Sequence, residues 1–134
     1  MIVSTKGRYA LRVMIDLAEQ NKEERVPLKE IAERQGISQK YIEAIMTMLS
    51  KHGFVDAVHG KGGGYRLNKK PEEYRVCDIL RLTEGSLSPV ACLEKNAEEC
   101  PRKSVCRTLP LWTKLDELVE GYLDSVNLAQ LMKQ

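Results

Sequence analysis

The sequence predicts a mainly α-helical fold that carries one small β-hairpin, and two stretches of the chain indicate it. Residues 28–49 are typical of a short helix, a glycine turn and a second helix with a long polar face, which is the helix-turn-helix plan. Residues 54–67 contain two short β-prone runs joined by a glycine-rich segment, which is typical of a hairpin. We therefore predict a winged helix-turn-helix domain over residues 1–85, a cysteine-bearing loop over 86–107, and a dimerisation helix with a C-terminal tail over 108–134.

The chain should begin with an amphipathic helix that follows Ser4 and Thr5 and runs to about Gln20. Lys6 and Arg8 lie in its first turn, where a cation opposes the helix dipole, so we expect these side chains to contact phosphate. The apolar residues of its inner face are Ala10, Met14, Leu17 and Ala18.

The helix-turn-helix carries a signal at each of its boundaries. Pro27 suits the start of the first helix, whose free N–H groups near Leu28 are candidate phosphate contacts. Gly36 suits a left-handed cap at the end of that helix, and Ser38 can cap the next one. A buried stripe in the second helix is formed by Ile42, Ile45 and Leu49. Its candidate DNA contacts are Ser38, Gln39, Lys40, Tyr41 and Glu43.

The hairpin has a basic, glycine-rich tip. His59, Gly60 and Lys61 lie at this tip, where they could reach phosphates or a minor groove. A flexible hairpin on an ordinary three-helix core is the alternative interpretation. Because a polar recognition helix and a basic wing occur side by side in the sequence, we predict double-stranded DNA as the partner.

Two further helices are predicted after the wing. Residues 76–83 have the spacing of an amphipathic helix that ends at Gly85, and Cys77 on it is interpreted as a small, partly buried residue. A longer helix begins at Pro110, and no other helix of its own chain is long enough to cover its apolar stripe. Pairing of two such helices in a homodimer would bury the stripe, and packing on its own domain is the alternative. The stripe consists of Trp112, Leu115, Leu118, Val119, Tyr122 and Leu123.

Charge and composition narrow the possible functions. Residues 1–70 hold 13 Lys and Arg against 8 Asp and Glu, whereas residues 71–134 hold 8 against 11. This distribution suggests that the N-terminal half binds DNA and that the C-terminal half serves assembly. The sequence shows no apolar run long enough to cross a membrane and no signal peptide, so we expect a cytoplasmic protein. An enzyme is not expected, because residues 60–64 lack the order of a nucleotide-binding loop and no nucleophile–base pattern occurs.

Three of the four cysteines lie close together in the chain. Cys92, Cys100 and Cys106 have the spacing C-x7-C-x5-C among few large apolar residues, so they suit thiolate ligation better than a hydrophobic core. In a reducing compartment, cysteines favour metal or redox chemistry over a structural disulfide. The spacing alone leaves an iron–sulfur cluster, a zinc site and a thiol switch open.

Several motifs resemble the Rrf-type family of winged helix-turn-helix transcription regulators, and the likeness extends over essentially the whole chain. Some members of this family bind an iron–sulfur cluster. The resemblance to them implies that Cys92, Cys100 and Cys106 of this chain are cluster ligands, with 2Fe–2S favoured over 4Fe–4S. It further implies a homodimer that binds a near-palindromic operator and controls genes of cluster assembly or cysteine supply. The motifs are residues 4–10, 33–38, 41–43 and 60–65.

The cysteine segment departs from the pattern of those cluster-binding members. Leu109 stands where they carry the histidine that completes the site, and the first cysteine spacing is x7 in place of x5. A fourth ligand must then come from elsewhere, such as the partner subunit or a small thiol. The candidates within the chain are Glu94, Glu98, Glu99 and Cys77.

The wing departs too, since His59 and Lys61 replace an arginine and a proline, which could change operator preference at its flanks. Glu43 would penalise wrong sequences unless it accepts from a cytosine amine, and cluster binding would alter how it is held. Ordering of segment 86–107 by the cluster would bias how the two recognition helices are presented to half-sites. The alternative is a cluster-free repressor of sulfur or cysteine metabolism, controlled by a partner protein, zinc or thiol oxidation.

Overall fold

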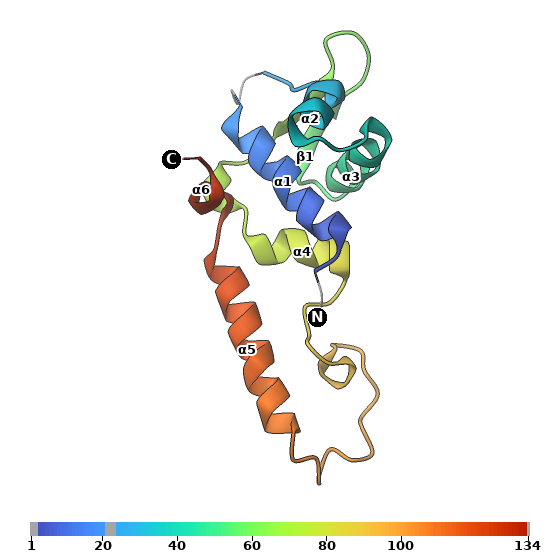
Figure 1. The fold of residues 1–134 in the computed structure, drawn as a ribbon, viewed down its shortest axis with the longest axis vertical. Helices are drawn as coiled ribbons and strands as arrows, with labels where there is room; N and C mark the ends of the chain where they lie inside the picture. The colour runs from blue at the N-terminus through green and yellow to red at the C-terminus, as the bar shows by residue number, and fades with distance from the viewer. Residues whose placement is uncertain (1–2, 21–23, 134) are drawn as a thin grey trace.

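The computed structural model describes residues 3–20 and 24–133 and confirms a mainly helical fold with one two-stranded antiparallel hairpin (Figure 1). A long helix, α5, extends away from the body of the molecule beside the cysteine segment. The elements in chain order are α1 (Thr5–Glu19), α2 (Leu28–Gln35), α3 (Gln39–Lys51), β1 (Val55–Val58), β2 (Gly64–Leu67), η1 (Pro71–Glu73), α4 (Val76–Glu84), η2 (Ala91–Leu93), α5 (Leu109–Ser125) and α6 (Leu128–Leu131).

Helix α1 forms the centre of the core. Its first turn is capped by Ser4, whose side chain accepts the backbone N–H of Gly7 at 3.0 Å. The predicted inner face is buried, and α2, α3, β2, α4 and α6 all pack against this helix. An apolar helix that is covered on several sides holds the remaining elements in place through the burial of nonpolar surface.

The helix-turn-helix forms as the sequence predicted. Gly36 adopts φ 65° at the end of α2, and Ser38 accepts the Tyr41 backbone N–H at 3.2 Å at the start of α3. An ion pair with a buried carboxylate joins α1 to α2: Asp16, which is only 4% exposed, accepts from the exposed Arg34 guanidinium at 2.8 Å and from the Gln35 amide at 2.8 Å. The apolar stripe of α3 is buried as predicted.

The hairpin is anchored to the body through the segment that precedes α2. Strands β1 and β2 pair with Val55 opposite Leu67 and Val58 opposite Gly64. Tyr65 then exchanges two backbone hydrogen bonds with Val26, at 2.8 and 2.9 Å. The base of the wing is therefore held by three extended segments, whereas its glycine-rich tip is exposed.

The last residues of the chain return to the core. Helix α4 ends at Gly85, with φ 77°, as the sequence predicted. Leu128 of α6 is fully buried in the main core, and its N–H donates to the Tyr74 carbonyl at 3.0 Å. The C-terminal tail thus packs with the winged domain, because Leu128 finds its apolar neighbours beside α1.

Within residues 3–20 and 24–133, no helix combines the length and the apolar character needed to cross a membrane.

Replacing Gly64 by alanine should lower the free energy of unfolding by about 2 kcal/mol, because a Cβ there would lie 2.5 Å from the Val26 carbonyl oxygen and the backbone conformation also disfavours a side chain. Gly62→Ala is the matched control: its φ is also positive, but a Cβ would meet nothing within 4 Å. Urea denaturation of both variants measures the difference. Equal losses at the two positions would contradict the proposed close packing of the wing on Val26.

Candidate nucleic-acid interface and cysteine cavity

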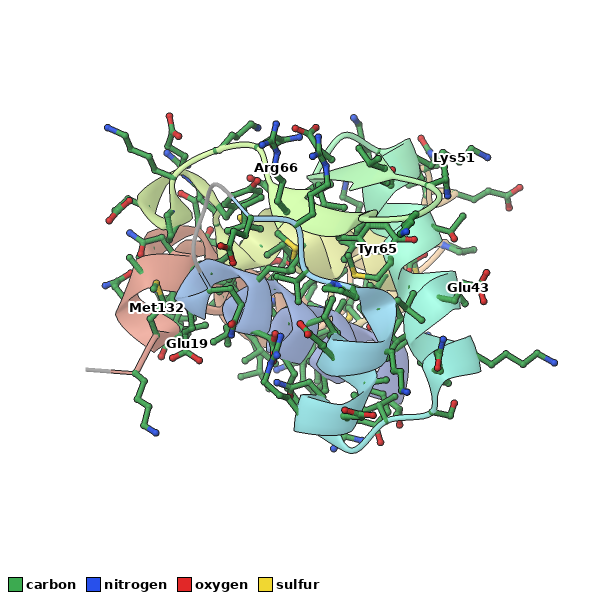
Figure 2. All side chains as sticks on the ribbon, turned by 90° about the horizontal axis from the view of Figure 1, so that it is seen from above. Glu19, Glu43, Lys51, Tyr65, Arg66 and Met132 are labelled. Atoms are coloured by element: carbon green, nitrogen blue, oxygen red, sulfur yellow. The ribbon has the colours of Figure 1, made fainter. Side chains whose placement is uncertain are left out.

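The candidate DNA contacts of α3 lie on its exposed side. Ser38, Lys40 and Glu43 are all exposed, and Glu43 projects from the outer side of the helix (Figure 2). Tyr41 is less exposed because its ring meets the Tyr9 ring edge-on, with 5.5 Å between centroids. Tyr9 in turn lies beneath the Arg12 guanidinium, so this stack joins α1 to the start of α3.

The wing adjoins the recognition helix. Burial raises the pKa of the Tyr65 hydroxyl, and the nearby Glu43 carboxylate raises it further. The hairpin packs on α3 through β1. The tip residues His59, Gly60 and Lys61 are exposed.

The remaining candidate DNA contacts divide into two groups. Lys6 and Arg8 are exposed in the first turn of α1, as predicted. Leu28 is half-buried against the core, so its side chain serves packing. Only its backbone N–H is a candidate contact, because Pro27 precedes it and the described residues provide no side-chain cap for α2.

The three clustered cysteines line one cavity of about 410 Å³ at the far end of the molecule. Cys92 and Cys100 are exposed and Cys106 is half-buried. Residues 94–108, all of which are described, contain no helix or strand, so the segment can adjust around a ligand. In this conformation no group of three His, Cys, Asp or Glu side chains among the described residues is placed to hold a metal ion.

The cavity narrows the set of candidate fourth ligands. Glu98 and Glu99 line it, whereas Glu94 and Cys77 are not among its described lining residues. Cys77 is instead fully buried on α4, where its thiol lies 3.5 Å from the Asp124 carboxylate. Leu109 lines the cavity, so the position that carries histidine in the cluster-binding pattern borders the same space as the three cysteines.

The two kinds of cysteine differ in reactivity. The Thr108 hydroxyl, 3.4 Å from the Cys106 sulfur, lowers the pKa of this thiol, and the backbone N–H groups of Thr108 and Leu109 lower it further. Burial raises the pKa of Cys77, and Asp78 and Asp124 add to this effect. Thiolate is the form that binds metals, so the exposed segment fits a thiolate-bound group and Cys77 does not. The sequence pattern gave no signal for the role of Thr108.

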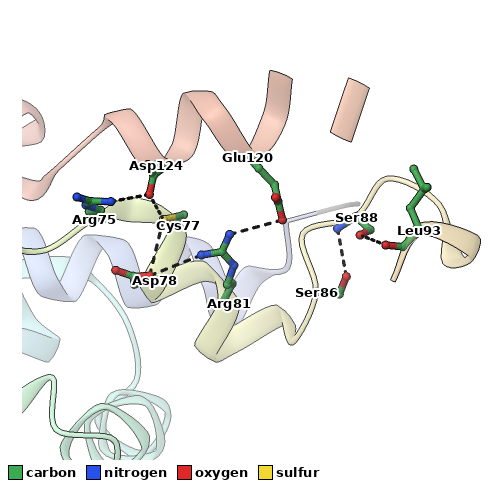
Figure 3. Close-up of polar contacts among 9 residues, drawn as sticks. All are labelled: Arg75, Cys77, Asp78, Arg81, Ser86, Ser88, Leu93, Glu120 and Asp124. Atoms are coloured by element: carbon green, nitrogen blue, oxygen red, sulfur yellow. Dashed lines mark hydrogen bonds and ion pairs between the residues drawn. The ribbon is translucent and has the colours of Figure 1, made fainter. Parts of the chain in front are cut away.

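Helix α5 packs on its own chain through both charged and apolar groups. Arg75, which precedes α4, donates to Asp124 at 2.9 Å, and Arg81 lies 3.5 Å from Glu120 (Figure 3). Leu123, which belongs to the predicted apolar stripe, packs inward against the small cluster of apolar residues on α4.

The opposite side of α5 is apolar and exposed. Leu118 and Tyr122 are 58% and 68% exposed, and none of the residues of α5, all of which are described, is buried. Leu111 extends this surface, although the sequence analysis did not include it. Trp112 and Val119 are half-buried at its edge. We call the residues Leu111, Leu115, Leu118 and Tyr122 the outer face of α5.

A helix-turn-helix with an adjoining wing, built on one core with α4 and α6, defines a winged helix-turn-helix transcription regulator. The chain belongs to the Rrf2 family: the family model described as an iron-dependent transcriptional regulator matches residues 3–134. This match confirms the resemblance that the sequence motifs indicated.

Curated relatives and solved structures place the chain among two kinds of Rrf2 regulator. It is 40% identical to the HTH-type transcriptional regulator IscR of Aliivibrio salmonicida, over 98% of this chain and 77% of that protein. It is 38% identical to the protein rrf2 of Nitratidesulfovibrio vulgaris, over 99% of this chain and 88% of that protein.

Among solved structures, CymR, the global cysteine regulator of B. subtilis, superimposes with a TM-score of 0.79 at 37% identity, covering 98% of this chain and 95% of that one. IscR of T. potens superimposes with a TM-score of 0.73 at 40% identity, covering 98% and 85%. The family and the fold are therefore shared by IscR and CymR proteins alike.

Alkylation by iodoacetamide at about pH 7 should modify Cys106 in the native protein and leave Cys77 intact, because the thiolate is the reactive form. Thr108→Val should slow modification of Cys106, since removing the hydroxyl raises the lowered pKa towards its ordinary value. Peptide mass spectrometry over time measures each rate, and Cys92 in the same protein is the internal reference. An unchanged Cys106 rate in Thr108→Val would contradict the assigned hydrogen bond.

Proposed function

We propose that this Rrf2 regulator binds an operator with an affinity that depends on an iron–sulfur cluster held by Cys92, Cys100 and Cys106. The observation that carries the proposal is the shared cavity, since three cysteines from one segment line the same space. The lowered pKa of Cys106 supports it, because a cluster binds thiolate. The cluster, when bound, supplies a group that is sensitive to oxidation and to iron supply.

The protein residues would act in two places. Cys92, Cys100 and Cys106 would draw segment 86–107 together, and Glu98 or Glu99 offers a carboxylate for the remaining ligand position. A carboxylate or external ligand would make the cluster easier to lose than a histidine does, which suits a sensor. We favour the 2Fe–2S form on the strength of the IscR relatives.

At the other end of the molecule, the polar start of α3 would enter the major groove and the wing tip would follow the neighbouring phosphates or minor groove. Lys6 and Arg8 would contact the backbone beside it. Glu43 would disfavour sequences that lack a donor opposite its carboxylate. Target genes for cluster assembly or cysteine supply are proposed from the IscR and CymR likenesses.

A cluster-free regulator is the second candidate, and the thiols themselves favour it. Cys92 and Cys100 are exposed and Cys106 has a lowered pKa, which is the environment of an oxidisable cysteine. Zinc binding or a partner protein could act on the same segment. The likeness to CymR, a global cysteine regulator, supports this candidate.

Anaerobic purification should yield a coloured protein that contains iron and acid-labile sulfide, and Cys100→Ala should lose both. Cys77→Ala is the matched control, since Cys77 is buried away from the cavity and should retain them. Absorption spectra with iron and sulfide analysis give the result. A colourless protein after reconstitution, with operator binding intact, would favour zinc or thiol control instead.

We further propose that the outer face of α5 pairs with the same face of a second copy, because a contiguous exposed apolar surface of this kind marks an interaction site. A two-fold dimer would set the two α3 helices against half-sites about 34 Å apart on a near-palindromic operator.

Leu118→Glu should convert the dimer to a monomer at micromolar concentration and weaken operator binding at least about tenfold, because burying one carboxylate per subunit opposes association. Glu117→Lys is the control: its side chain is exposed beside the outer face, so the dimer should persist. Light scattering coupled to gel filtration measures the mass. A dimer of Leu118→Glu with unchanged operator affinity would contradict the assigned interface.

A further inference from the structure

Glu84, the last residue of α4, reaches across to the beginning of α1. Its carboxylate accepts from the Ser4 hydroxyl at 2.5 Å and from the Ser4 backbone N–H at 3.3 and 3.4 Å. The same Ser4 oxygen accepts from the Gly7 backbone N–H at 3.0 Å and so caps α1. The orientation of this cap therefore depends on a side chain that lies eighty residues away in the sequence.

Other groups also pack against the half-buried Glu84 side chain. The Thr83 hydroxyl lies 3.1 Å from the Glu84 carboxylate and shares its proton with the Leu80 carbonyl, also at 3.1 Å. A Cβ at Gly7 would overlap the same carboxylate oxygen, so α1 approaches the end of α4 as closely as a glycine allows. The negative charge also lies at the positive end of the α1 dipole, which favours this arrangement. The first turn of α1 is thus held by Glu84 from one side.

Two functional segments meet at this contact. The exposed Lys6 and Arg8 belong to the turn that Glu84 holds. On the other side, Gly85 leads directly into the connector to the cysteines, where Leu87 is buried against α4 and Ser88 donates to the Leu93 carbonyl at 3.2 Å (Figure 3). The path from Cys92 to Glu84 is therefore short and anchored. Val3, beside the Ser4 cap, also packs against the apolar cluster on α4, and Glu84 supplies the polar contact to the cap itself.

We propose that Glu84 is a positioning residue for operator binding, which orients the first turn of α1 so that Lys6 and Arg8 meet phosphates and links that turn to the cysteine segment. The inference rests on the proposed function, because it takes Lys6 and Arg8 as phosphate contacts. Glu84 itself does not touch DNA. Its role is to set the direction in which α1 presents two cations.

Charge and position make opposite predictions for Glu84. Removing an acidic residue from a DNA-binding protein ordinarily strengthens binding, since repulsion from phosphate is lost. Removing a positioning group weakens it. Glu72→Ala supplies the charge control, because Glu72 is exposed on η1. Glu84→Gln supplies the conservative variant, because its amide oxygen can still accept from Ser4.

Operator binding by the full chain, followed by fluorescence anisotropy across a salt series, tests the positioning role. Glu84→Ala should bind about tenfold more weakly, Glu84→Gln should recover most of the loss, and Glu72→Ala should not weaken binding. The plot of log K against log salt should become shallower in Glu84→Ala by up to about 1.8, the contribution of two phosphate contacts. A mere loss of folded protein would leave this slope unchanged.

A combined variant separates positioning from general destabilisation. In the Lys6→Ala/Arg8→Ala background, Glu84→Ala should change operator affinity less than about twofold, since the groups that it positions are absent. The same tenfold loss in that background, or an unchanged salt slope, would overturn the proposal. These readouts do not require a cluster.

The link to the cysteine segment has its own measurement. In protein that iron and sulfide analysis shows to hold a cluster, the ratio of operator affinities with and without the cluster should fall towards one in Glu84→Ala. An unchanged ratio would overturn the link. If the wild-type chain binds no cluster, the proposed cluster function fails, whereas the salt-slope result still decides the positioning role of Glu84.

Discussion

The burial of α1 is the constraint on which the rest of the structure depends. This helix is covered by α2, α3, β2, α4 and α6, so a shift along its axis would disturb every other part of the winged domain. Asp16 also fixes the position of α1 relative to α2, because its buried carboxylate must stay beside Arg34 and Gln35 to keep its hydrogen bonds. Helix α3 is held in turn by its buried stripe in the same core and by the Tyr9–Tyr41 contact. The placement of α3 therefore rests on that of α1.

Helix α5 contrasts with α1, because none of its residues is buried. Its Glu120 and Asp124 pair with Arg81 and Arg75 of its own chain and Leu123 packs inward, while the residues of its outer face are exposed. A surface ion pair contributes little to stability, so these contacts set the orientation of α5 more than they stabilise its packing. In the dimer that we propose, burial of the exposed apolar surface would supply more of the association energy. A second copy would cover that surface and would tie the cysteine segment to the dimer.

The cysteine segment connects the winged domain to α5. Unlike both, it contains no helix or strand between residues 94 and 108. Its residues expose their thiols because few large apolar side chains nearby could bury them. An irregular backbone suits a segment that a ligand would order, since a ligand can order only a segment that is not already packed against the core. The cavity at Cys92, Cys100 and Cys106 shows where such ordering would act, and Ser88 and Leu87 show where it would reach the folded domain.

The sequence by itself determined the longer helices α1 to α5, the wing and the class of protein, because these depend on local signals: the αL glycine at Gly36, the cap at Ser38 and the period of apolar residues. It gave no signal for the short helix α6. The family motifs are equally local. Only the tertiary structure decided which side of α5 faces outward, that Leu128 returns to the core, and that Cys77 lies apart from the other thiols. It also placed Glu84 against Ser4. Such contacts join residues far apart in the chain, and no local pattern specifies which distant surface a side chain will meet.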